Sequence, residues 1–92
     1  MRPLSFSVTP GRRKALEVLV KHGYARESNI TGVDGHEIPC IYWQSRAWLD
    51  KKGLIVQHRY KRQWIWVLTD AGVELCHELA MAPKQLELFA DA

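Results

Sequence analysis

Residues 46–72 have the sequence RAWLDKKGLIVQHRYKRQWIWVLTDAG, and the hydrophobic pattern of this stretch changes twice. Helical spacing of the apolar residues ends at Gly53, and glycine commonly follows the last turn of a helix. Residues 54–60 then alternate between two faces, and residues 63–68 are rich in aromatic and β-branched side chains, as in a β-hairpin. Thr69 is suited to cap a further helix. The stretch therefore predicts a helix, a hairpin and a second helix in direct succession.

Two helices are expected before the hairpin. The first spans residues 9–22, because Thr9 and Pro10 suit a helix start and Gly23 suits a helix end. The second spans residues 40–52. Its core-facing side is predicted to consist of Ile41, Ser45, Trp48 and Leu49.

The segment between these two helices shows no helical period. Residues 24–27 are predicted to be extended. Residues 28–39 are predicted to form an irregular loop, because the segment contains Gly32, Gly35 and Pro39. The expected order is therefore helix, loop, helix, hairpin, helix.

The bulk properties describe one small globular domain. The chain has 92 residues, of which 47% are hydrophobic and 25% are charged, and this length supports one compact core. Residues 1–82 are expected to form the domain and residues 83–92 a tail, because Pro83 breaks the last helix. The net charge is +3, which favours an anionic partner over a cationic one.

The residue types present predict neither an enzyme nor a cofactor. Cys40 and Cys76 are predicted to be reduced thiols in the core, since two distant cysteines make no disulfide framework. Together with His36 and His77 they fit no standard zinc spacing, and no third group is placed to orient a catalytic Cys–His pair. The first residues do not resemble a signal peptide and no apolar run could span a membrane, so a cytoplasmic protein is expected.

Two blocks of the chain resemble the winged helix-turn-helix family, and in particular its MarR-like and small phage-type members. Residues 46–55, RAWLDKKGLI, are similar to the end of the recognition helix, and residues 68–72, LTDAG, to the L-T-x-x-G after the second wing strand. The resemblance implies an α+β fold of three helices with a two-stranded hairpin wing. It also implies a small transcriptional regulator, of phage or bacterial origin, that binds double-stranded DNA. The chain departs from the family in residues 28–39, where the supporting helix is reduced or replaced by a loop.

The resemblance assigns DNA contacts to the outward face of the second helix. Gln44 is expected to bond an adenine edge and Arg46 to reach a guanine or a phosphate, and a solvated face is the alternative for both residues. Lys51 is placed to hold a phosphate where the helix leaves the groove. Trp43 has two interpretations: packing beneath the loop of residues 28–39, which we favour, or contact with DNA.

The hairpin turn concentrates positive charge. Arg59, Lys61 and Arg62 stand where the tip of a wing would lie along phosphates or in the minor groove. The alternative is an exposed hairpin that its charge keeps soluble. We favour the contact with DNA, because the charge lies where the fold requires it.

A second cationic cluster begins the first helix. Arg12, Arg13 and Lys14 oppose the dipole at a helix N-terminus, so another interaction should favour them. Phosphate contact is one candidate for that interaction, and a solvated face is the other.

The tail carries a separate signal, the pentapeptide QLELF at residues 85–89. It resembles the Q-L-x-L-F motif by which many bacterial proteins bind the replicative sliding clamp. The resemblance implies that such a clamp is bound through Gln85, Leu86, Leu88 and Phe89. The alternatives are that these residues pack on the domain's own core or form a homodimer contact. The function that competes with DNA-dependent regulation is therefore that of a protein-interaction adaptor in replication.

Overall fold

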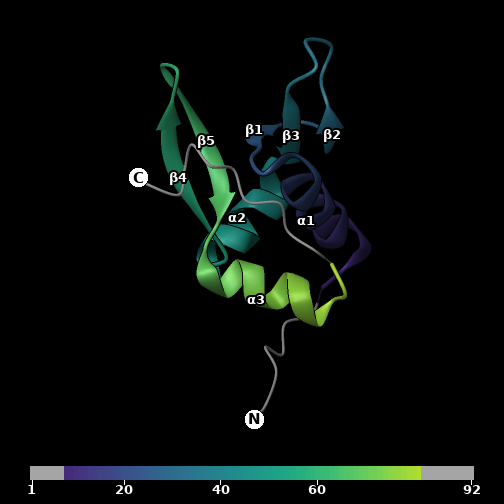
Figure 1. The fold of residues 1–92 in the computed structure, drawn as a ribbon. Helices are drawn as coiled ribbons and strands as arrows, with labels where there is room; N and C mark the ends of the chain where they lie inside the picture. Colours follow the sequence, from purple (N-terminus) through teal and green to yellow (C-terminus); the bar gives the residue numbers. More distant parts are fainter. Residues whose placement is uncertain (1–7, 82–92) are drawn as a thin grey trace.

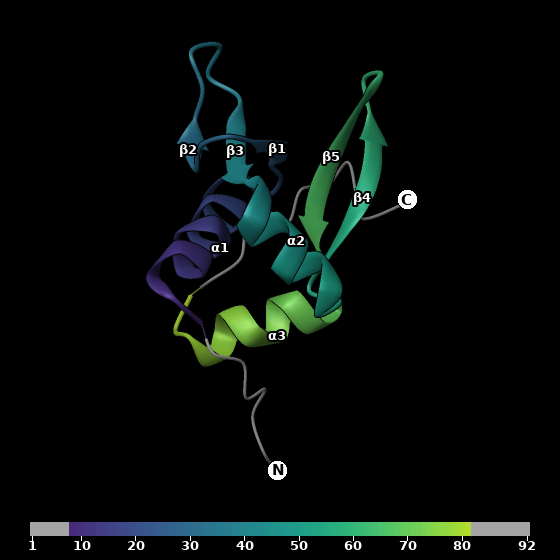
Figure 2. The same ribbon diagram turned by 180° about the vertical axis from the view of Figure 1, so that it is seen from behind.

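The computed structural model describes residues 8–81, which form an α+β fold of three helices and two small sheets (Figure 1). Two hairpins project in the same direction from one end of the domain, and the last helix lies at the opposite end (Figures 1 and 2). In chain order the elements are α1 (Pro10–His22), β1 (Arg26–Ser28), β2 (Gly32–Val33), β3 (Pro39–Tyr42), α2 (Trp43–Lys51), β4 (Ile55–Tyr60), β5 (Gln63–Leu68) and α3 (Asp70–Glu78).

Helix α1 has the ends that its sequence predicts. The Thr9 hydroxyl accepts a hydrogen bond from the backbone N–H of Arg12 (3.3 Å), and Pro10 occupies the first turn. Gly23 takes a left-handed conformation (φ 84°), and its N–H donates to the Leu19 carbonyl (2.8 Å). The predicted first helix is therefore confirmed.

A three-stranded sheet occupies the segment that was expected to be a loop. Strand β3 lies at its centre, parallel to β1 and antiparallel to β2. The prediction of an irregular loop over residues 28–39 is therefore wrong, although residues 24–39 hold no helix, as expected. These strands are only two to four residues long, too short to leave a periodic pattern in the sequence. Their pairing supplies the backbone hydrogen bonds that a supporting helix would otherwise make internally.

Helix α2 starts later than predicted. Residues 40–42 belong to β3, so the predicted helix start at Cys40 is wrong and the helix begins at Trp43. Pairing with β1 on one side and β2 on the other keeps this segment extended as far as Tyr42 (φ −62°, ψ 138°). Ile41 is buried, as predicted, but it lies on a strand and not on the predicted helix face.

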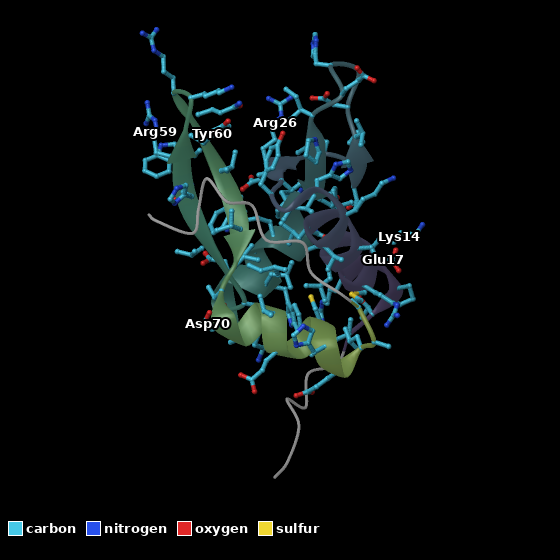
Figure 3. All side chains as sticks on the ribbon, in the orientation of Figure 1. Lys14, Glu17, Arg26, Arg59, Tyr60 and Asp70 are labelled. Carbon is cyan, nitrogen blue, oxygen red and sulfur yellow. The ribbon has the colours of Figure 1, made fainter. Side chains whose placement is uncertain are left out.

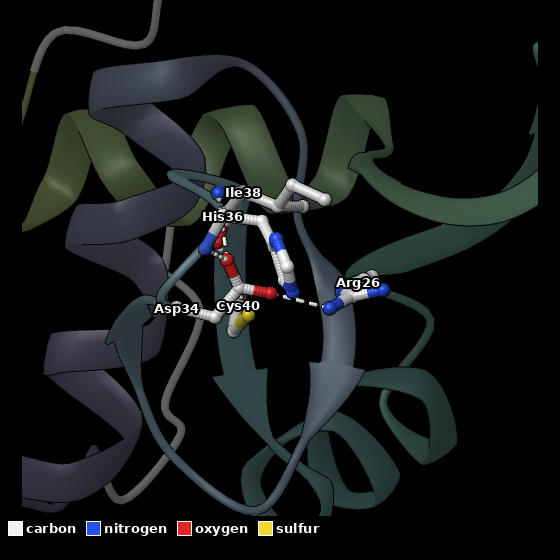
Figure 4. Close-up of polar contacts among 5 residues, drawn as sticks. All are labelled: Arg26, Asp34, His36, Ile38 and Cys40. Carbon is white, nitrogen blue, oxygen red and sulfur yellow. Dashed lines mark hydrogen bonds and ion pairs between the residues drawn. The ribbon is translucent and has the colours of Figure 1, made fainter.

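The tip between β2 and β3 is organised by the carboxylate of Asp34 (Figure 4). This carboxylate accepts hydrogen bonds from the backbone N–H groups of His36 (2.7 Å) and Ile38 (3.0 Å), and it pairs with the Arg26 guanidinium of β1. The Ile38 N–H first, then the His36 N–H and the Arg26 cation, hold the pKa of Asp34 below its ordinary value of 3.8. The Cys40 thiol donates to the Ile38 carbonyl (3.2 Å). One carboxylate thus ties β1 to the tip.

Replacing Asp34 with Asn is expected to destabilise the domain at neutral pH, because the amide carries no charge to pair with Arg26. The carboxyl has a lower pKa in the folded chain than in the unfolded chain. Its contribution to stability is therefore present above the unfolded value and is lost as pH falls through the folded value. The difference in urea midpoint between wild type and D34N should be largest near neutral pH and shrink as pH is lowered beyond 3.8. A Glu37→Gln variant controls for the lost negative charge, and a difference that does not change with pH would contradict the assignment.

Strands β4 and β5 form the predicted antiparallel hairpin. Their register pairs Tyr60 with Gln63 and leaves Lys61 and Arg62 as a two-residue turn. A backbone bridge at Trp66 also joins β5 to the residue that precedes β1. The hairpin is therefore connected to the rest of the fold along β5, and the tip of the hairpin projects away from the helices (Figure 1).

The base of this hairpin is fixed to the start of α3 by Thr69 and Gly72. The Thr69 hydroxyl donates to the Gly53 carbonyl (2.6 Å) and accepts from the Gly72 N–H (3.2 Å). The Thr69 backbone N–H donates to the Leu54 carbonyl (3.0 Å). A Cβ added at Gly72 would lie 2.1 Å from the Leu54 carbonyl oxygen, so a side chain cannot be accommodated without a shift of the backbone. These contacts explain why the sequence LTDAG holds a threonine and a glycine at this spacing.

Substitution of Gly72 by Ala is expected to lower the free energy of unfolding by about 2–3 kcal/mol, because the new methyl group forces α3 away from Leu54. Gly11→Ala is the matched control, since Gly11 is also helical and nothing lies within 4 Å of its added Cβ. The control should be neutral or stabilising by up to about 1 kcal/mol. Urea denaturation measures both variants, and equal effects would show that the close approach at Gly72 imposes no constraint.

All three helices and both sheets contribute to one hydrophobic core. Its most buried members are Ala15, Leu16, Leu19, Ala25, Ile41, Leu49, Leu54, Ile55, Trp66, Leu75 and Cys76. Both cysteines are buried and unpaired, as predicted, and burial raises the pKa of the Cys76 thiol to about 11. None of the helices in residues 8–81 combines the length and the apolar content that a membrane span needs.

Candidate nucleic-acid interface

The first turn of helix α2 exposes two of the residues that were predicted to contact DNA. Ser45 and Leu49 are buried, as predicted, and this orientation leaves Trp43 and Gln44 exposed on the first turn. Trp43 is 43% exposed and tilts against the ring of Tyr42, with the ring centroids 5.7 Å apart. The chain therefore packs only part of the Trp43 ring, and the first turn of α2 presents an aromatic and an amide side chain to solvent.

Arg46 is held by the protein instead of extending into solvent. Its Nε lies 2.8 Å from the Glu27 carboxylate, and its Nη1 lies 3.5 Å from Asp50 one turn further along α2. Its guanidinium also lies over the Trp66 ring, 5.1 Å from the centroid, and the side chain is only 21% exposed. Contact of Arg46 with a base or a phosphate would require these interactions to break. In this structure Arg46 joins α2 to β1 and β5.

The turn of the β4–β5 hairpin holds its cations in a strained backbone conformation. Lys61 and Arg62 are exposed and both have positive φ values (49° and 68°), which cost a residue with a Cβ about 1–2 kcal/mol. The Arg59 guanidinium lies 5.2 Å from the centroid of the Trp64 ring, and the Lys61 ammonium lies 5.2 Å from that of Tyr60. These five residues are called the tip cluster below, and Figure 3 labels two of them, Arg59 and Tyr60, on the outer part of the hairpin.

Two of the cations at the start of α1 have partners within the domain. The Arg12 guanidinium lies over the Trp48 ring, 4.2 Å from the centroid. Arg13 donates to the Leu79 carbonyl at the end of α3 (3.4 Å) and pairs with Glu17 (3.6 Å). A cation is favourable at a helix C-terminus, so the contact with α3 offsets the unfavourable position of Arg13 at the start of α1. Intramolecular packing therefore accounts for Arg12 and Arg13 without a bound phosphate.

The structure brings some of the predicted DNA-binding residues together and separates others. Lys51 is exposed in the last turn of α2, directly before the hairpin. Lys14 lies on the opposite side of the molecule from Arg59 and Tyr60 (Figure 3) and lines a shallow groove between α1 and β2. Helix α2 and the hairpin thus form one candidate interface, and Lys14 is not part of it.

Trp64 belongs to this candidate interface but was missed from the sequence. It is 53% exposed and is directly opposite Arg59 in the strand register. From the sequence alone, Trp64 indicated only that residues 63–68 form a strand. With the two-residue turn fixed, however, the alternation of both strands already places Arg59 and Trp64 on one face.

Comparison of the chain with family models, characterised proteins and solved structures gave no match. In the described part of the chain, no group of three or more His, Cys, Asp or Glu side chains could hold a metal ion. The predicted clamp-binding residues Gln85, Leu86, Leu88 and Phe89 lie outside the described residues. A functional assignment therefore depends on the geometry of α2 and the hairpin.

Arg46→Ala is expected to lower the free energy of unfolding by about 1–2 kcal/mol, because it removes both ion pairs and the packing over Trp66. Gln44 lies two residues before Arg46 on the exposed side of α2 and serves as the control. Gln44→Ala should change the free energy of unfolding by about 0.5 kcal/mol or less. Urea denaturation of both variants measures the difference. If R46A unfolds at the same urea concentration as Q44A, the structural role assigned to Arg46 is wrong.

Proposed function

We propose that this protein is a winged helix-turn-helix domain that binds double-stranded DNA. In this proposal α2 is the recognition helix in the major groove, and the β4–β5 hairpin is the wing on the phosphates. The order of the elements supports the proposal: α2 ends at the base of an antiparallel hairpin, and the third helix follows and packs against β5. An α-helix fits the major groove, and an exposed hairpin beside it can follow the sugar–phosphate backbone.

The observation that carries the proposal is the pair of cations in the left-handed turn. A two-residue hairpin turn with positive φ at both positions is the type for which Asn-Gly is the preferred pair. This chain instead has Lys61 and Arg62 there, both exposed, at a conformational cost that Asn-Gly would avoid. Residues in strained backbone conformations cluster at functional sites, which supports a role for these two side chains. Two adjacent cations at the end of a projecting hairpin suit contact with phosphates.

On α2, the residue best suited to read a base is Gln44. Its exposed amide can donate to and accept from the edge of an adenine in the major groove. Lys51 can hold a phosphate at the other end of the helix. Arg46, which has ion-pair partners within the domain, positions the helix. Because few side chains of α2 can read bases, most of the affinity is expected from phosphate contacts that do not depend on sequence.

The three-stranded sheet takes the place of a supporting helix. Strand β3 ends at Tyr42 and α2 begins at the next residue, so the direction of the sheet determines where the recognition helix starts. The Arg46–Glu27 ion pair then holds the helix to β1, the neighbour of β3 in that sheet. The sheet can therefore orient α2 without a second helix packed across it.

A Lys61→Asn/Arg62→Gly variant is expected to stabilise the fold and yet weaken DNA binding. The free energy of unfolding should rise by about 1 kcal/mol, because Asn and Gly tolerate positive φ. Affinity for random-sequence duplex DNA should fall by about tenfold or more at moderate salt, and the slope of log K against log salt should become less steep by about two. Urea denaturation and fluorescence anisotropy at several salt concentrations measure the two effects.

A Lys14→Gln/Lys21→Gln variant is the control, since it removes the same charge from two exposed residues of α1. It should retain most of the affinity, because Lys14 lies on the opposite side of the molecule from the tip cluster (Figure 3). Equal loss of affinity in both variants would indicate attraction by net charge alone. Failure of the wild type to bind duplex DNA at low salt would reject the proposed function.

A further inference from the structure

Trp64 has the highest exposure of the large hydrophobic side chains that are exposed in residues 8–81. It is 53% exposed, compared with 43–49% for the other four, which are Ile30, Val33, Trp43 and Val56. It also lies two residues after Arg62 of the cationic turn, on a hairpin that projects from the domain. An aromatic ring at such a position adds little to the core, so its exposure calls for another explanation.

The strand register fixes the face of the hairpin on which Trp64 lies. In an antiparallel ladder, paired residues share a face, and residues two apart along one strand lie on that same face. Trp64 therefore shares its face with Trp66 and with its cross-strand neighbour Arg59. The Trp66 ring contacts Arg46 of α2, so this is the side of the hairpin that faces the proposed recognition helix. Trp64 continues the same face outward, past the point where α2 covers it.

The surroundings of Trp64 combine a flat ring with several cations. Arg59 lies over the ring, and Lys61 and Arg62 follow at the turn. Binding to the phosphates of an intact duplex uses cations but not an exposed indole ring. Binding to unpaired nucleotides uses both, because each base offers a face for stacking and is joined to a phosphate. The tip cluster therefore has the chemistry of a stacking platform for single-stranded nucleic acid.

We infer that the tip cluster binds unpaired bases of DNA through stacking on Trp64, next to a duplex segment that α2 and the turn cations hold. The inference rests on the proposed function, and it makes the preferred ligand a duplex with a single-stranded extension. A purely structural role for Trp64, as a cross-strand partner of Arg59, would stabilise the hairpin but give no preference for unpaired bases.

The test compares three labelled DNA probes by fluorescence anisotropy: a blunt duplex, the same duplex with a short single-stranded extension, and the single strand alone. Wild type is expected to bind the extended duplex about tenfold more tightly than the blunt duplex. Trp64→Leu should abolish this preference, while Trp64→Phe should keep part of it. Lys61→Asn/Arg62→Gly should weaken binding to all three probes.

Two controls keep the result unambiguous. Trp43→Leu removes the other exposed tryptophan, on α2, and should leave the preference for the extended duplex unchanged. Single-strand DNA should also quench part of the tryptophan emission of the wild type but not of a folded W64L variant, with folding checked by circular dichroism.

Binding to blunt duplex without any preference for the extension would overturn the inference and leave the proposed function intact. Trp64-dependent binding to the single strand without duplex binding would support the stacking platform and reject the proposed function. Absence of binding to every probe would reject both.

Discussion

The contact between the residues that follow α2 and the start of α3 sets the geometry of the β4–β5 hairpin. Thr69 bonds to the carbonyls of Gly53 and Leu54, and Gly72 allows α3 to approach the Leu54 oxygen where a Cβ could not fit. Gly53 and Leu54 lead into β4, and Thr69 follows β5. The same few atoms therefore hold both strands at the base of the hairpin and cap the next helix. A hairpin fixed in this way extends as a unit, and its direction relative to α2 is determined.

Arg46 supplies a second constraint, and it changes what the exposed face of α2 can do. The helical spacing predicts that this side chain flanks the outward face, where an arginine could reach a guanine or a phosphate. The fold instead surrounds it with Glu27, Asp50 and the Trp66 ring. A guanidinium that is partly desolvated by packing on an aromatic ring and paired with two carboxylates is costly to withdraw. Arg46 therefore links α2 to β1 and β5. The exposed side chains that can contact a ligand are those of Gln44, Trp43 and the tip cluster.

Within residues 8–81, four residues other than glycine have positive φ, and three of them lie at the two projecting tips. Lys61 and Arg62 adopt a left-handed turn that suits neither residue, and Glu37 lies at the tip between β2 and β3, where the Asp34 carboxylate accepts from two backbone N–H groups. The two hairpins project in the same direction but differ in charge: the first tip has carboxylates at Asp34 and Glu37, and the second has three cations. An anionic ligand is therefore favoured at the second hairpin and disfavoured at the first.

The sequence by itself determined the elements whose signals are local. Thr9, Gly23 and Thr69 act within a single helical turn, and the alternation around Lys61 and Arg62 defines a hairpin without reference to the rest of the chain. The candidate cations of the hairpin and the exposure of Gln44 could be predicted for the same reason. Only the tertiary structure decided the sheet around β3, the later start of α2 and the partners of Arg12 and Arg46. Each of these depends on residues from other elements, such as Glu27, Trp48 and Trp66, and spacing along one helix or strand holds no information about which distant group will meet it.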